Sequence, residues 1–309
     1  MQGILDALRA VAEPTRLRLL ALCAEGEFTV SELTQIVGQS QPRVSRHLKQ
    51  LSDAGLLERL PEGSWVFYRV ASEAKAGQLA RHIVSQLPGD EMNLAQDHER
   101  LAAVRRARAD AASNYFRANA AQWDEIRSLQ VDDALVEQHL VGLLPPTGIG
   151  ALLDVGTGTG RILELYGEQG VTGIGVDLSR EMLAVARANL SKAGLSNVYV
   201  RHGDMYRLPW PAPAFDAITV HQVLHFADDP GAAIAEAARV MRPGGRLVIV
   251  DLAPHDVEML RREHAHRRLG FADGEVSGWF ADAGLQPGPV DRLPGNKLTI
   301  TLWAATRPH

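Results

Sequence analysis

Hydrophobic positions in the first 85 residues recur at helical spacing and then alternate as they do in strands. Helical spacing predicts helices in LDALRAV, TRLRLLALCAEG, SELTQIVG and QPRVSRHLKQLSDAG. Gly26 is placed to end the second of these helices, and Ser40 and Pro42 are placed to begin the last. A β-hairpin is predicted next, from LLERL, the turn PEGS and WVFYRV, which is rich in β-branched and aromatic residues. Helices followed by a hairpin predict a small α+β domain.

Beyond residue 90 the pattern changes twice. Residues 90–145 have mostly helical spacing, and the Arg- and Ala-rich stretch ERLAAVRRARADA is little suited to burial, which predicts a solvated connecting helix. From residue 150 onward, strand-like runs alternate with helical ones. The predicted strands are ALLDVG, TGIGVDL, VYVRHGD, FDAITVHQ, RLVIVDL and LTITLWAA. This alternation predicts a doubly wound, Rossmann-like α/β domain.

The length of the chain, 309 residues, agrees with two domains. We expect a first domain at 1–90, a helical connector and lid at 91–145, and the α/β domain at 146–309. An apolar content of 46% and a charged content of 22% are ordinary for a globular protein. Composition therefore favours folded domains over a disordered or fibrous chain.

Charge, cysteine content and the longest apolar runs exclude several classes of protein. No apolar run approaches about 18 residues, so neither a transmembrane helix nor a membrane partner is expected. The stretch MQGILDALRAVAEPTRLRLL lacks a signal-peptide cleavage pattern, which predicts a cytoplasmic protein. Cys23 is the single cysteine, so an internal disulfide and a Cys-rich metal site are excluded. The net charge of −5 does not indicate nucleic acid, although a whole-chain value can hide a local basic patch.

A basic patch of this kind lies on the helix predicted from Ser40 to Leu51. Val44, Leu48 and Leu51 are spaced to dock the helix on its domain. The polar positions carry no acid and comprise Gln41, Arg43, Ser45, Arg46, His47 and Lys49. Arginine is the commonest bidentate partner of guanine, and glutamine pairs with adenine. The pattern fits either a few solvated cations or a helix that enters the DNA major groove. The attached hairpin, as in a winged helix-turn-helix, favours DNA.

Residues 5–72 strongly resemble the ArsR/SmtB family of bacterial repressors, above all in the phrase SQPRVSRHLKQLSDAGL. The resemblance implies a homodimer that binds a pseudo-palindromic operator in double-stranded DNA. It implies base or phosphate contacts from Ser40, Gln41, Arg43, Ser45, Arg46 and His47. Arg59 and Arg69, on the predicted wing hairpin, are implied as phosphate contacts.

The sequence departs from this family at the metal site. Many members sense metal through two cysteines in a Glu-Leu-Cys-Val-Cys-Asp-Leu stretch. The matching positions here carry Thr29 and Ser31, and hydroxyls are poor ligands for soft metals. Cys23 lies on the apolar stripe of its helix, which favours a core position. A second family site uses His and Asp on a later helix, but His82, Asp97 and His98 do not match its spacing and are interpreted as surface residues. No metal is expected.

Candidate chemistry in the second domain begins with the loop in LLDVGTGTGRI, residues 152–162. A dinucleotide fingerprint G-x-G-x-x-G that starts at Gly156 and Gly158 would need a third glycine where this chain has Arg161. A bulky residue there opposes close packing of a pyrophosphate on the helix. The G-x-G-x-G spacing suits a ligand with a nucleoside but no pyrophosphate. Small residues in an ordinary strand–helix turn are the alternative.

Two further acids strengthen the nucleoside interpretation. Asp177 comes twenty-one positions after Gly156 and ends the strand GIGVD, where a carboxylate can accept both hydroxyls of a ribose. Asp204 follows the next strand, where it can accept from an adenine amino group while Met205 lies against the ring. Each acid alone also fits a turn or a helix cap. Asp154, Asp177 and Asp204 at successive strand ends favour an adenosine site.

Residues 110–307 resemble class I S-adenosylmethionine-dependent methyltransferases, nearest to the UbiE-like group. The resemblance rests on LLDVGTGTG, GVDLS, HGDMYRLPW, FDAITVHQVLHF and RVMRPGGRLVIVDL. It implies S-adenosylmethionine (SAM) or S-adenosylhomocysteine (SAH) as the ligand. The methionine part of the ligand is implied to lie at Asp154, Gly156, Thr157 and Gly158. The resemblance also implies that Asp177 and Leu178 contact ribose and adenine, that Asp204 and Met205 contact adenine, and that His221 and Gln222 line the pocket. The stretch YFRANAAQWDEIRSL resembles the helical lid of this group, so Tyr115 is expected to close over the cofactor.

Whether methyl transfer occurs is left open by the sequence. Transfer from a sulfonium is an in-line displacement, and a base is needed only if the acceptor must lose a proton. His221 and His225 are candidate bases, and His264 and His266 are further pocket-wall candidates, with a structural role as the alternative for each. An Asn-Pro-Pro-Tyr stretch and the cysteines of arsenite methyltransferases are absent from the sequence. The small-molecule acceptor therefore stays undefined.

Three hypotheses follow from these observations. The first is a repressor whose methyltransferase domain senses SAM or SAH. The second is an active small-molecule methyltransferase with an accessory DNA-binding domain. The third is a chain whose first domain only dimerises or docks substrate. The intact polar face of the Ser40–Leu51 helix counts against the third hypothesis.

Overall fold

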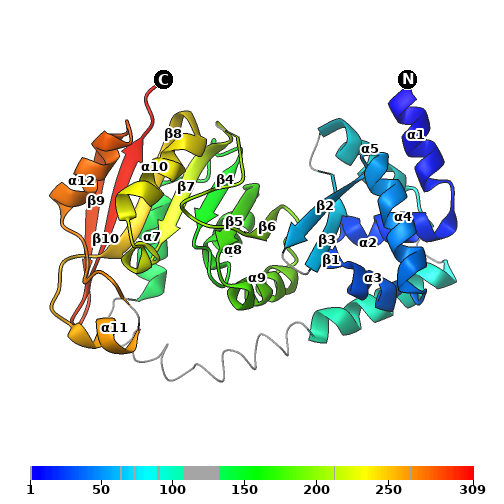
Figure 1. The fold of residues 1–309 in the computed structure, drawn as a ribbon, viewed down its shortest axis with the longest axis horizontal. Coiled ribbons are helices and arrows are strands. Elements are labelled where there is room, and N and C mark those ends of the chain that lie inside the picture. The colour runs from blue at the N-terminus through cyan, green and yellow to red at the C-terminus, as the bar shows by residue number, and fades with distance from the viewer. Residues whose placement is uncertain are drawn as a thin grey trace. The chain divides into compact units, whose positions relative to one another are not determined.

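The computed structural model describes residues 2–62, 65–71, 74–88, 91–107, 132–211, 213–264 and 266–309. The chain forms two compact units, Met1–Arg108 and Ala109–His309 (Figure 1). The expected two-domain architecture is confirmed, but the division lies beyond the expected residue 90. Among the described residues, no helix is long and apolar enough to cross a membrane.

The first unit is a bundle of helices around a three-stranded sheet. Its elements are α1 (Gln2–Val11), α2 (Pro14–Ala24), β1 (Phe28–Thr29), α3 (Val30–Val37), α4 (Gln41–Asp53), β2 (Leu57–Glu62), β3 (Trp65–Val70) and α5 (Ala74–Ser85), followed by a helix at 92–107. The sheet is antiparallel with the order β1-β3-β2. Gly38 ends α3 in the left-handed region, with φ of 67°, which glycine adopts without steric cost. The predicted helices and hairpin are confirmed.

The helix at 92–107 belongs to the first unit, which corrects the expectation of a solvated connector. Leu94, Leu101 and Val104 are buried in the same core as α2 to α4. Asp97, expected on the surface, is only 1% exposed and pairs with Arg18 at 2.6 Å. The arginines of this stretch surround a narrow apolar stripe, and that stripe is enough to dock the helix.

The second unit is a seven-stranded sheet between two layers of helices. Its elements are α7 (Asp133–Leu143), β4 (Leu152–Val155), α8 (Arg161–Gly167), β5 (Gly173–Asp177), α9 (Arg180–Lys192), β6 (Val198–His202), β7 (Phe215–His221), η1 (Leu224–Phe226), α10 (Pro230–Val240), β8 (Met241–Leu252), α11 (Glu258–Glu263), α12 (Asp273–Asp282), β9 (Gln286–Pro294) and β10 (Thr299–Thr306). The strand order is β6-β5-β4-β7-β8-β10-β9, and β10 runs antiparallel to both of its neighbours. This is the predicted doubly wound α/β fold.

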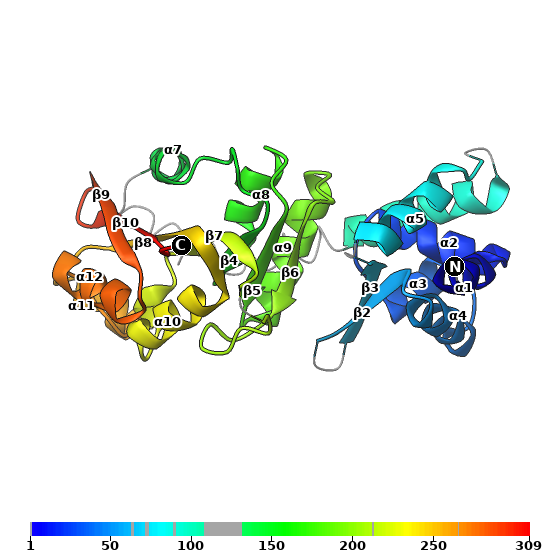
Figure 2. The ribbon, with the colours of Figure 1, turned by 90° about the horizontal axis from the view of Figure 1, so that it is seen from above.

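Successive residues of the central strands supply the two cores. Leu152 faces the core beneath α7, α8 and α9, whereas Leu153 faces the core beneath α10 and α12. Figure 2 shows α7 and α8 on one side of the sheet and α10 and α12 on the other. Because β6, β5, β4 and β7 are parallel neighbours, their carboxyl ends share one edge of the sheet, where ligands bind in open α/β sheets.

The edge strand β9 was not predicted. Its sequence, QPGPVDRLP, carries prolines and has mostly exposed or half-buried positions, so it lacks a hydrophobic signal. It is formed by antiparallel pairing with β10, in a register that joins Leu293 to Ile300. The six predicted strands of this unit are all present.

Candidate functional site

The polar face of α4 is open to solvent. Arg43 and Arg46 are exposed, and no ion pair joins either of them to another residue that the structure describes. Gln41 is exposed and Ser45 is half-buried. Ser40 occupies the N-cap position as predicted, but its side chain makes no capping hydrogen bond. Cations and hydrogen-bonding groups along one helix face can contact phosphates and base edges.

Of the α4 residues expected to contact DNA, His47 is buried and Lys49 has a partner within the protein. His47 is buried, with its Nδ1 3.7 Å from Oε2 of Glu13. Its burial leaves little of the ring open to the expected base or phosphate contact, and neither ring nitrogen has a hydrogen-bond partner among the described residues. Lys49 is exposed, and its Nζ donates to Asp53 one turn later at 2.7 Å. An exposed pair of this kind is weak, so Lys49 can exchange Asp53 for a phosphate.

The two arginines of the wing hairpin differ in exposure. Arg59, on β2, is exposed. Arg69, on β3, is mostly buried and pairs with Glu58 at 2.7 Å and with Glu27 at 4.0 Å. The expected phosphate contact from Arg69 is therefore opposed by two carboxylates that already hold its guanidinium.

The positions that match the family's metal-binding cysteines have a structural use here. Thr29 is the N-cap of α3, where its Oγ1 accepts from the Glu32 amide at 3.2 Å and the Glu32 carboxylate accepts from the Thr29 amide at 2.7 Å. This reciprocal capping box stabilises the start of α3. Cys23 is buried in the core, which raises the pKa of its thiol. The described residues contain no group of three or more His, Cys, Asp or Glu that could hold a metal ion.

The glycine loop of the second unit combines tight packing at one glycine with open space at another. Gly156 and Gly158 both have positive φ, 71° and 52°. A Cβ on Gly156 would lie 2.5 Å from Val223 Cγ2, so this glycine permits close packing of the loop. A Cβ on Gly158 would meet nothing within 4 Å. The backbone at Gly158 therefore borders space that a ligand can occupy.

Asp177 ties the end of β5 to this loop. Its Oδ2 accepts from the Gly158 amide at 2.9 Å, and its Oδ1 accepts from the Ser179 amide at 2.8 Å. A carboxylate oxygen has room for a second hydrogen bond, so Asp177 can still accept from hydroxyl groups. The next residue, Leu178, is 67% exposed, which is unusual for a large apolar side chain and leaves it able to cover a flat ring.

Asp154 is a buried carboxylate with an unused oxygen. It is 1% exposed, and its Oδ1 accepts from Thr219 Oγ1 at 2.6 Å, whereas Oδ2 has no partner. Burial raises the pKa of Asp154 to about 6. A buried, unpartnered carboxylate oxygen is costly unless a bound group satisfies it. Asp154, together with open space at Gly158, therefore fits a ligand that brings a hydrogen-bond donor or a positive charge.

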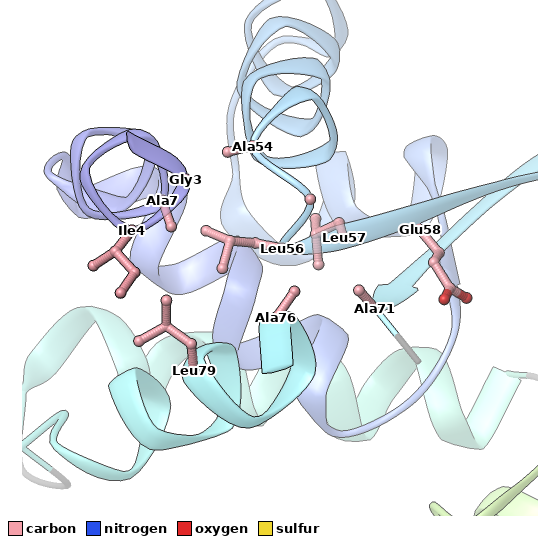
Figure 3. A pocket seen from close by; sticks show the side chains of 11 residues that line it. Gly3, Ile4, Ala7, Ala54, Leu56, Leu57, Glu58, Ala71, Ala76 and Leu79 are labelled. Atoms are coloured by element: carbon pink, nitrogen blue, oxygen red, sulfur yellow. The ribbon is translucent and has the colours of Figure 1, made fainter. Parts of the chain in front are cut away.

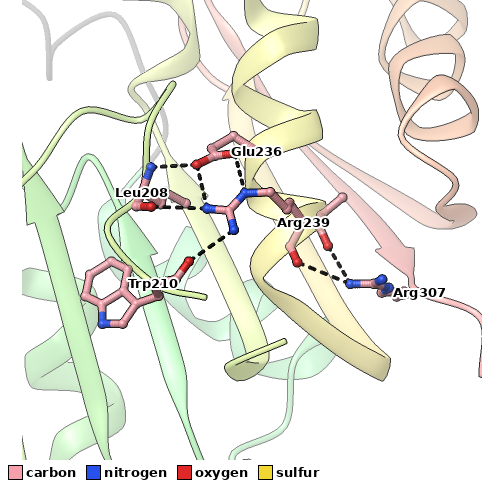
Figure 4. A network of polar contacts seen from close by, with 6 residues as sticks. Leu208, Trp210, Glu236, Arg239 and Arg307 are labelled. Carbon is pink, nitrogen blue, oxygen red and sulfur yellow. Dashed lines mark hydrogen bonds and ion pairs between the residues drawn. The ribbon is translucent and has the colours of Figure 1, made fainter. Parts of the chain in front are cut away.

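The loop that carries Asp204 is held against α10. Glu236 accepts from the Leu208 amide at 2.6 Å, and Arg239 donates to the carbonyl oxygens of Leu208 and Trp210, both at 3.1 Å (Figure 4). Asp204 itself is exposed and accepts from the Tyr206 amide, so it also acts as a turn residue. Met205, next in this loop, packs against the core of the α10 side. The network fixes the loop beside the shared edge.

The end of β7 carries backbone strain. Gln222, directly after the strand, has φ of 51°. Among the described residues, no other residue besides glycines has a positive φ. Such strain tends to occur at ligand sites, where the fold imposes it. His221 lies beside it at the same edge, and burial lowers the pKa of its imidazole.

His225 belongs to a buried cluster one strand farther along. Its Nδ1 lies 2.8 Å from Oδ1 of Asp251, which is fully buried at the end of β8 and also accepts from the backbone amides of His225 and Leu252. His266 stacks on the His225 ring with a centroid distance of 3.9 Å. Because an ionised carboxylate only accepts, Asp251 favours the tautomer of His225 that leaves Nε2 as a base.

Comparison with known proteins agrees with this geometry. Residues 13–59 match the model of the bacterial regulatory protein arsR family, and residues 153–249 match that of a methyltransferase domain. The demethylmenaquinone methyltransferase of Thermus thermophilus is 33% identical over 159 residues, which cover 50% of this chain and 72% of that protein. The chain belongs to the methyltransferase family. Its first unit is an ArsR-type helix-turn-helix domain, fused to the methyltransferase domain.

Two further proteins are similar to this chain, one for each domain. Arsenic resistance transcriptional regulator ArsR1 of Pseudomonas putida is 47% identical over 66 residues, which cover 21% of this chain and 52% of that protein. The solved structure of a geranyl diphosphate methyltransferase in complex with SAM is also similar, with a TM-score of 0.50 and 20% identity. The match covers 57% of this chain and 85% of the geranyl diphosphate methyltransferase chain. At this identity the likeness concerns the fold alone.

The methyltransferase domain brings most of the predicted cofactor residues to one edge of its sheet. Asp154, Asp177, Asp204 and His221 lie at or just after the ends of four neighbouring parallel strands. Tyr115, expected in the lid, lies outside the described residues. Asp251 was missed, although an acid that ends the run RLVIVDL repeats the signal used for Asp177.

Proposed function

We propose that this protein is a DNA-binding transcriptional regulator, acting in the cytoplasm, whose affinity for operator DNA depends on SAM or SAH bound to its methyltransferase domain. The observation that carries the proposal is the free cationic face of α4 at Arg43 and Arg46, in one chain with a glycine loop open at Gly158. The first feature supports binding to phosphates and bases, and the second supports binding of a nucleoside ligand.

The ligand, in this proposal, takes the place of the metal signal of the ArsR family. Thr29 is engaged in capping α3, and hydroxyl groups are poor ligands for soft metals. SAM carries a sulfonium charge and a transferable methyl group, and SAH lacks both. The unpartnered Oδ2 of Asp154 supports a ligand with a positive charge or donor. The residues proposed to hold it are Asp154, Gly156, Thr157, Gly158, Asp177, Leu178, Asp204, Met205, His221 and Gln222.

We also propose a homodimer, built through the apolar surface around α1. Ile4, Leu5 and Leu8 on this helix are exposed. Beside them lies a cavity of about 530 Å³ between α1, α5 and the turn before β2 (Figure 3). Exposed apolar surface of this kind commonly marks a protein–protein interface, and a second copy would cover it. Sedimentation of the wild-type protein and of an Ile4→Glu/Leu8→Glu double variant tests this, because the variant is expected to be monomeric.

The regulator proposal is tested by titrating the DNA upstream of the gene with and without SAM and SAH. Asp177→Ala is expected to abolish the ligand effect while operator binding without ligand is retained. Arg43→Ala is expected to weaken operator binding while ligand affinity is retained. Reciprocity requires that operator DNA change the affinity for the ligand by the same factor. Equal operator affinity at saturating SAM, saturating SAH and no ligand would overturn the proposal.

A second candidate function, methyl transfer to a small molecule, is favoured by the His225–Asp251 pair. The buried Asp251 orients His225, which is the arrangement of a general base for an acceptor that must lose a proton. Cell-derived metabolites supplied with SAM should then yield SAH, and His225→Asn should lower kcat. His139→Asn is the control. His139 also pairs with an aspartate, Asp291 at 3.0 Å, but His139 lies on α7 and not in the His225 cluster. A metabolite screen with SAM binding and no SAH formation would exclude this function.

A further inference from the structure

A bidentate ion pair joins α7 to the start of α8. Arg161 donates from Nε and Nη2 to the two carboxylate oxygens of Glu137, at 2.6 and 2.7 Å. The Glu137 side chain is 14% exposed and that of Arg161 52%. A planar guanidinium and a carboxylate that meet through two parallel hydrogen bonds have one preferred geometry. The pair therefore fixes α7 relative to α8.

A positive charge at the position of Arg161 does not stabilise α8 itself. Arg161 is the first residue of the helix, where the helix dipole disfavours a cation. Its partners are Glu137 on α7 and, more weakly at 3.3 Å, Glu164 on α8 itself. Arg161 directly follows Gly160, the last glycine of the loop. The ion pair with Glu137 is thus formed by the residue that directly follows the glycine loop.

Two acids on α7, Asp133 and Glu137, act electrostatically on His221, one of the proposed ligand residues. Burial lowers the pKa of His221, and the nearby carboxylates of Asp133 and Glu137 oppose that shift. Asp133 and Glu137 are four residues apart and so share one face of α7. The apolar contacts of α7 come from Val136 and Leu140, which neighbour Glu137 on the helix surface and are buried in the core. Glu137, whose side chain is 14% exposed, therefore lies at the margin of the face by which α7 packs on its unit.

Within the first unit, the helix at 92–107 supports the helix-turn-helix. Arg100 donates to the carbonyl oxygen of Ile36 at 3.1 Å. Arg18, held by Asp97, donates to the carbonyl oxygen of Val37 at 2.9 Å. These are the last carbonyl groups of α3, immediately before the turn that leads to α4. The position of the helix at 92–107 therefore bears on the position of α4.

We propose that α7 is the element that responds to occupancy of the cofactor site, and that the Glu137–Arg161 pair is the contact through which it responds. The proposal rests on the proposed function and assigns its regulation to a residue outside the ligand-binding set. The response requires only that the ligand bind two arrangements of α7 with different affinity.

Amide hydrogen exchange of the full-length protein, with and without saturating SAH, tests this directly. In the wild type, SAH should slow exchange of residues 134–143 by about threefold or more, as expected when a partly buried charge-assisted contact tightens. Glu137→Gln should lose that effect. Glu164→Gln is the matched control, because it removes the other carboxylate on Arg161 without touching α7, and it should behave as wild type. Calorimetry of each variant establishes saturation by SAH.

A second variant and a second readout separate the possible failures. Arg161→Lys keeps the charge but not the two-pronged geometry, and it should behave like Glu137→Gln. The ratio of operator affinities with and without SAH should move toward one in Glu137→Gln and stay unchanged in Glu164→Gln. No SAH effect on α7 in the wild type, or equal behaviour of Glu137→Gln and Glu164→Gln, would overturn the inference. If only the operator ratio of the wild type is one, the regulator proposal fails and the exchange result for α7 still decides this inference.

Discussion

The rings of His225 and His266 stack with centroids 3.9 Å apart and planes inclined by 16°, and both are buried. Two imidazolium ions cannot share such a site, because burial and mutual repulsion both oppose the second charge. Asp251 is paired with His225, so His266 is the ring that stays neutral. The pKa of His266 is lowered to about 3, first by burial and then by its electrostatic interaction with His225.

The first prediction is an acid-sensitive stability that depends on His266. Its pKa in the folded protein, about 3, lies below the ordinary histidine value of 6.5 that applies in the unfolded chain. Between pH 6.5 and 3, His266 binds a proton in the unfolded chain but stays neutral in the folded chain. The free energy of unfolding therefore falls as the pH falls toward 3. The slope for one proton is about 1.4 kcal/mol per pH unit. Urea denaturation between pH 7 and 4 should show a shallower slope in His266→Phe, and an unchanged slope would contradict the assignment.

The second prediction concerns the buried pair of Arg18 and Asp97. Asp97→Asn leaves the Arg18 guanidinium without its carboxylate, and such a change costs about 3–5 kcal/mol of unfolding free energy at a buried site. Asp6→Asn is the control, because it breaks the exposed pair with Arg9 and should change stability by no more than about 0.5 kcal/mol. Urea denaturation of both variants measures the difference. Similar small effects would mean that the helix at 92–107 is not held by this pair.

Local periodicity was sufficient for most of the fold but not for the helix at 92–107. In ERLAAVRRARADA, only Leu101 and Val104 signal a buried face, and the arginines dominate the pattern. Arg100 and Arg105 have partners far away in sequence, the Ile36 carbonyl and Glu25. Partners of this kind arise from tertiary packing, so no local pattern could have assigned this helix to the first unit.

The cofactor residues were predictable because the end of a parallel strand is marked in the sequence by an apolar run followed by an acid or a glycine. The same rule would have found Asp251. Side-chain orientation on α4 and β3 was not predictable in this way. His47 and Arg69 differ from exposed DNA contacts through Glu13, Glu58 and Glu27, which other elements bring to them.

The third prediction contrasts the two wing arginines. Arg59→Ala should weaken operator binding and lower the slope of log affinity against log salt by about 1, as for one lost phosphate contact. Arg69→Ala removes a partner of Glu58 and Glu27 and should lower stability while leaving the salt slope unchanged. Fluorescence anisotropy of labelled operator over a series of KCl concentrations measures the slope. A larger slope change for Arg69→Ala than for Arg59→Ala would reverse the assignment.

The last prediction separates the two glycines that shape the cofactor loop. Gly158→Ala places a methyl group in open space, so the fold should lose only the roughly 1–2 kcal/mol that a left-handed backbone costs. The same methyl group enters the space proposed for the ligand, and affinity for SAH should fall about tenfold or more, a loss of about 1.4 kcal/mol. Calorimetric titration with SAH beside urea denaturation resolves the two effects. Wild-type affinity in Gly158→Ala would place the ligand elsewhere.

Gly156→Ala should behave in the opposite way, because its Cβ would lie 2.5 Å from Val223 Cγ2 and the loop must move. We expect a stability loss of about 1–3 kcal/mol beyond the backbone cost, as in overpacked cores. The added change Val223→Ala removes the methyl groups in contact and should restore part of that stability in Gly156→Ala but none in Gly158→Ala. No restoration in Gly156→Ala would show that backbone strain, and not the contact with Val223, requires glycine at position 156.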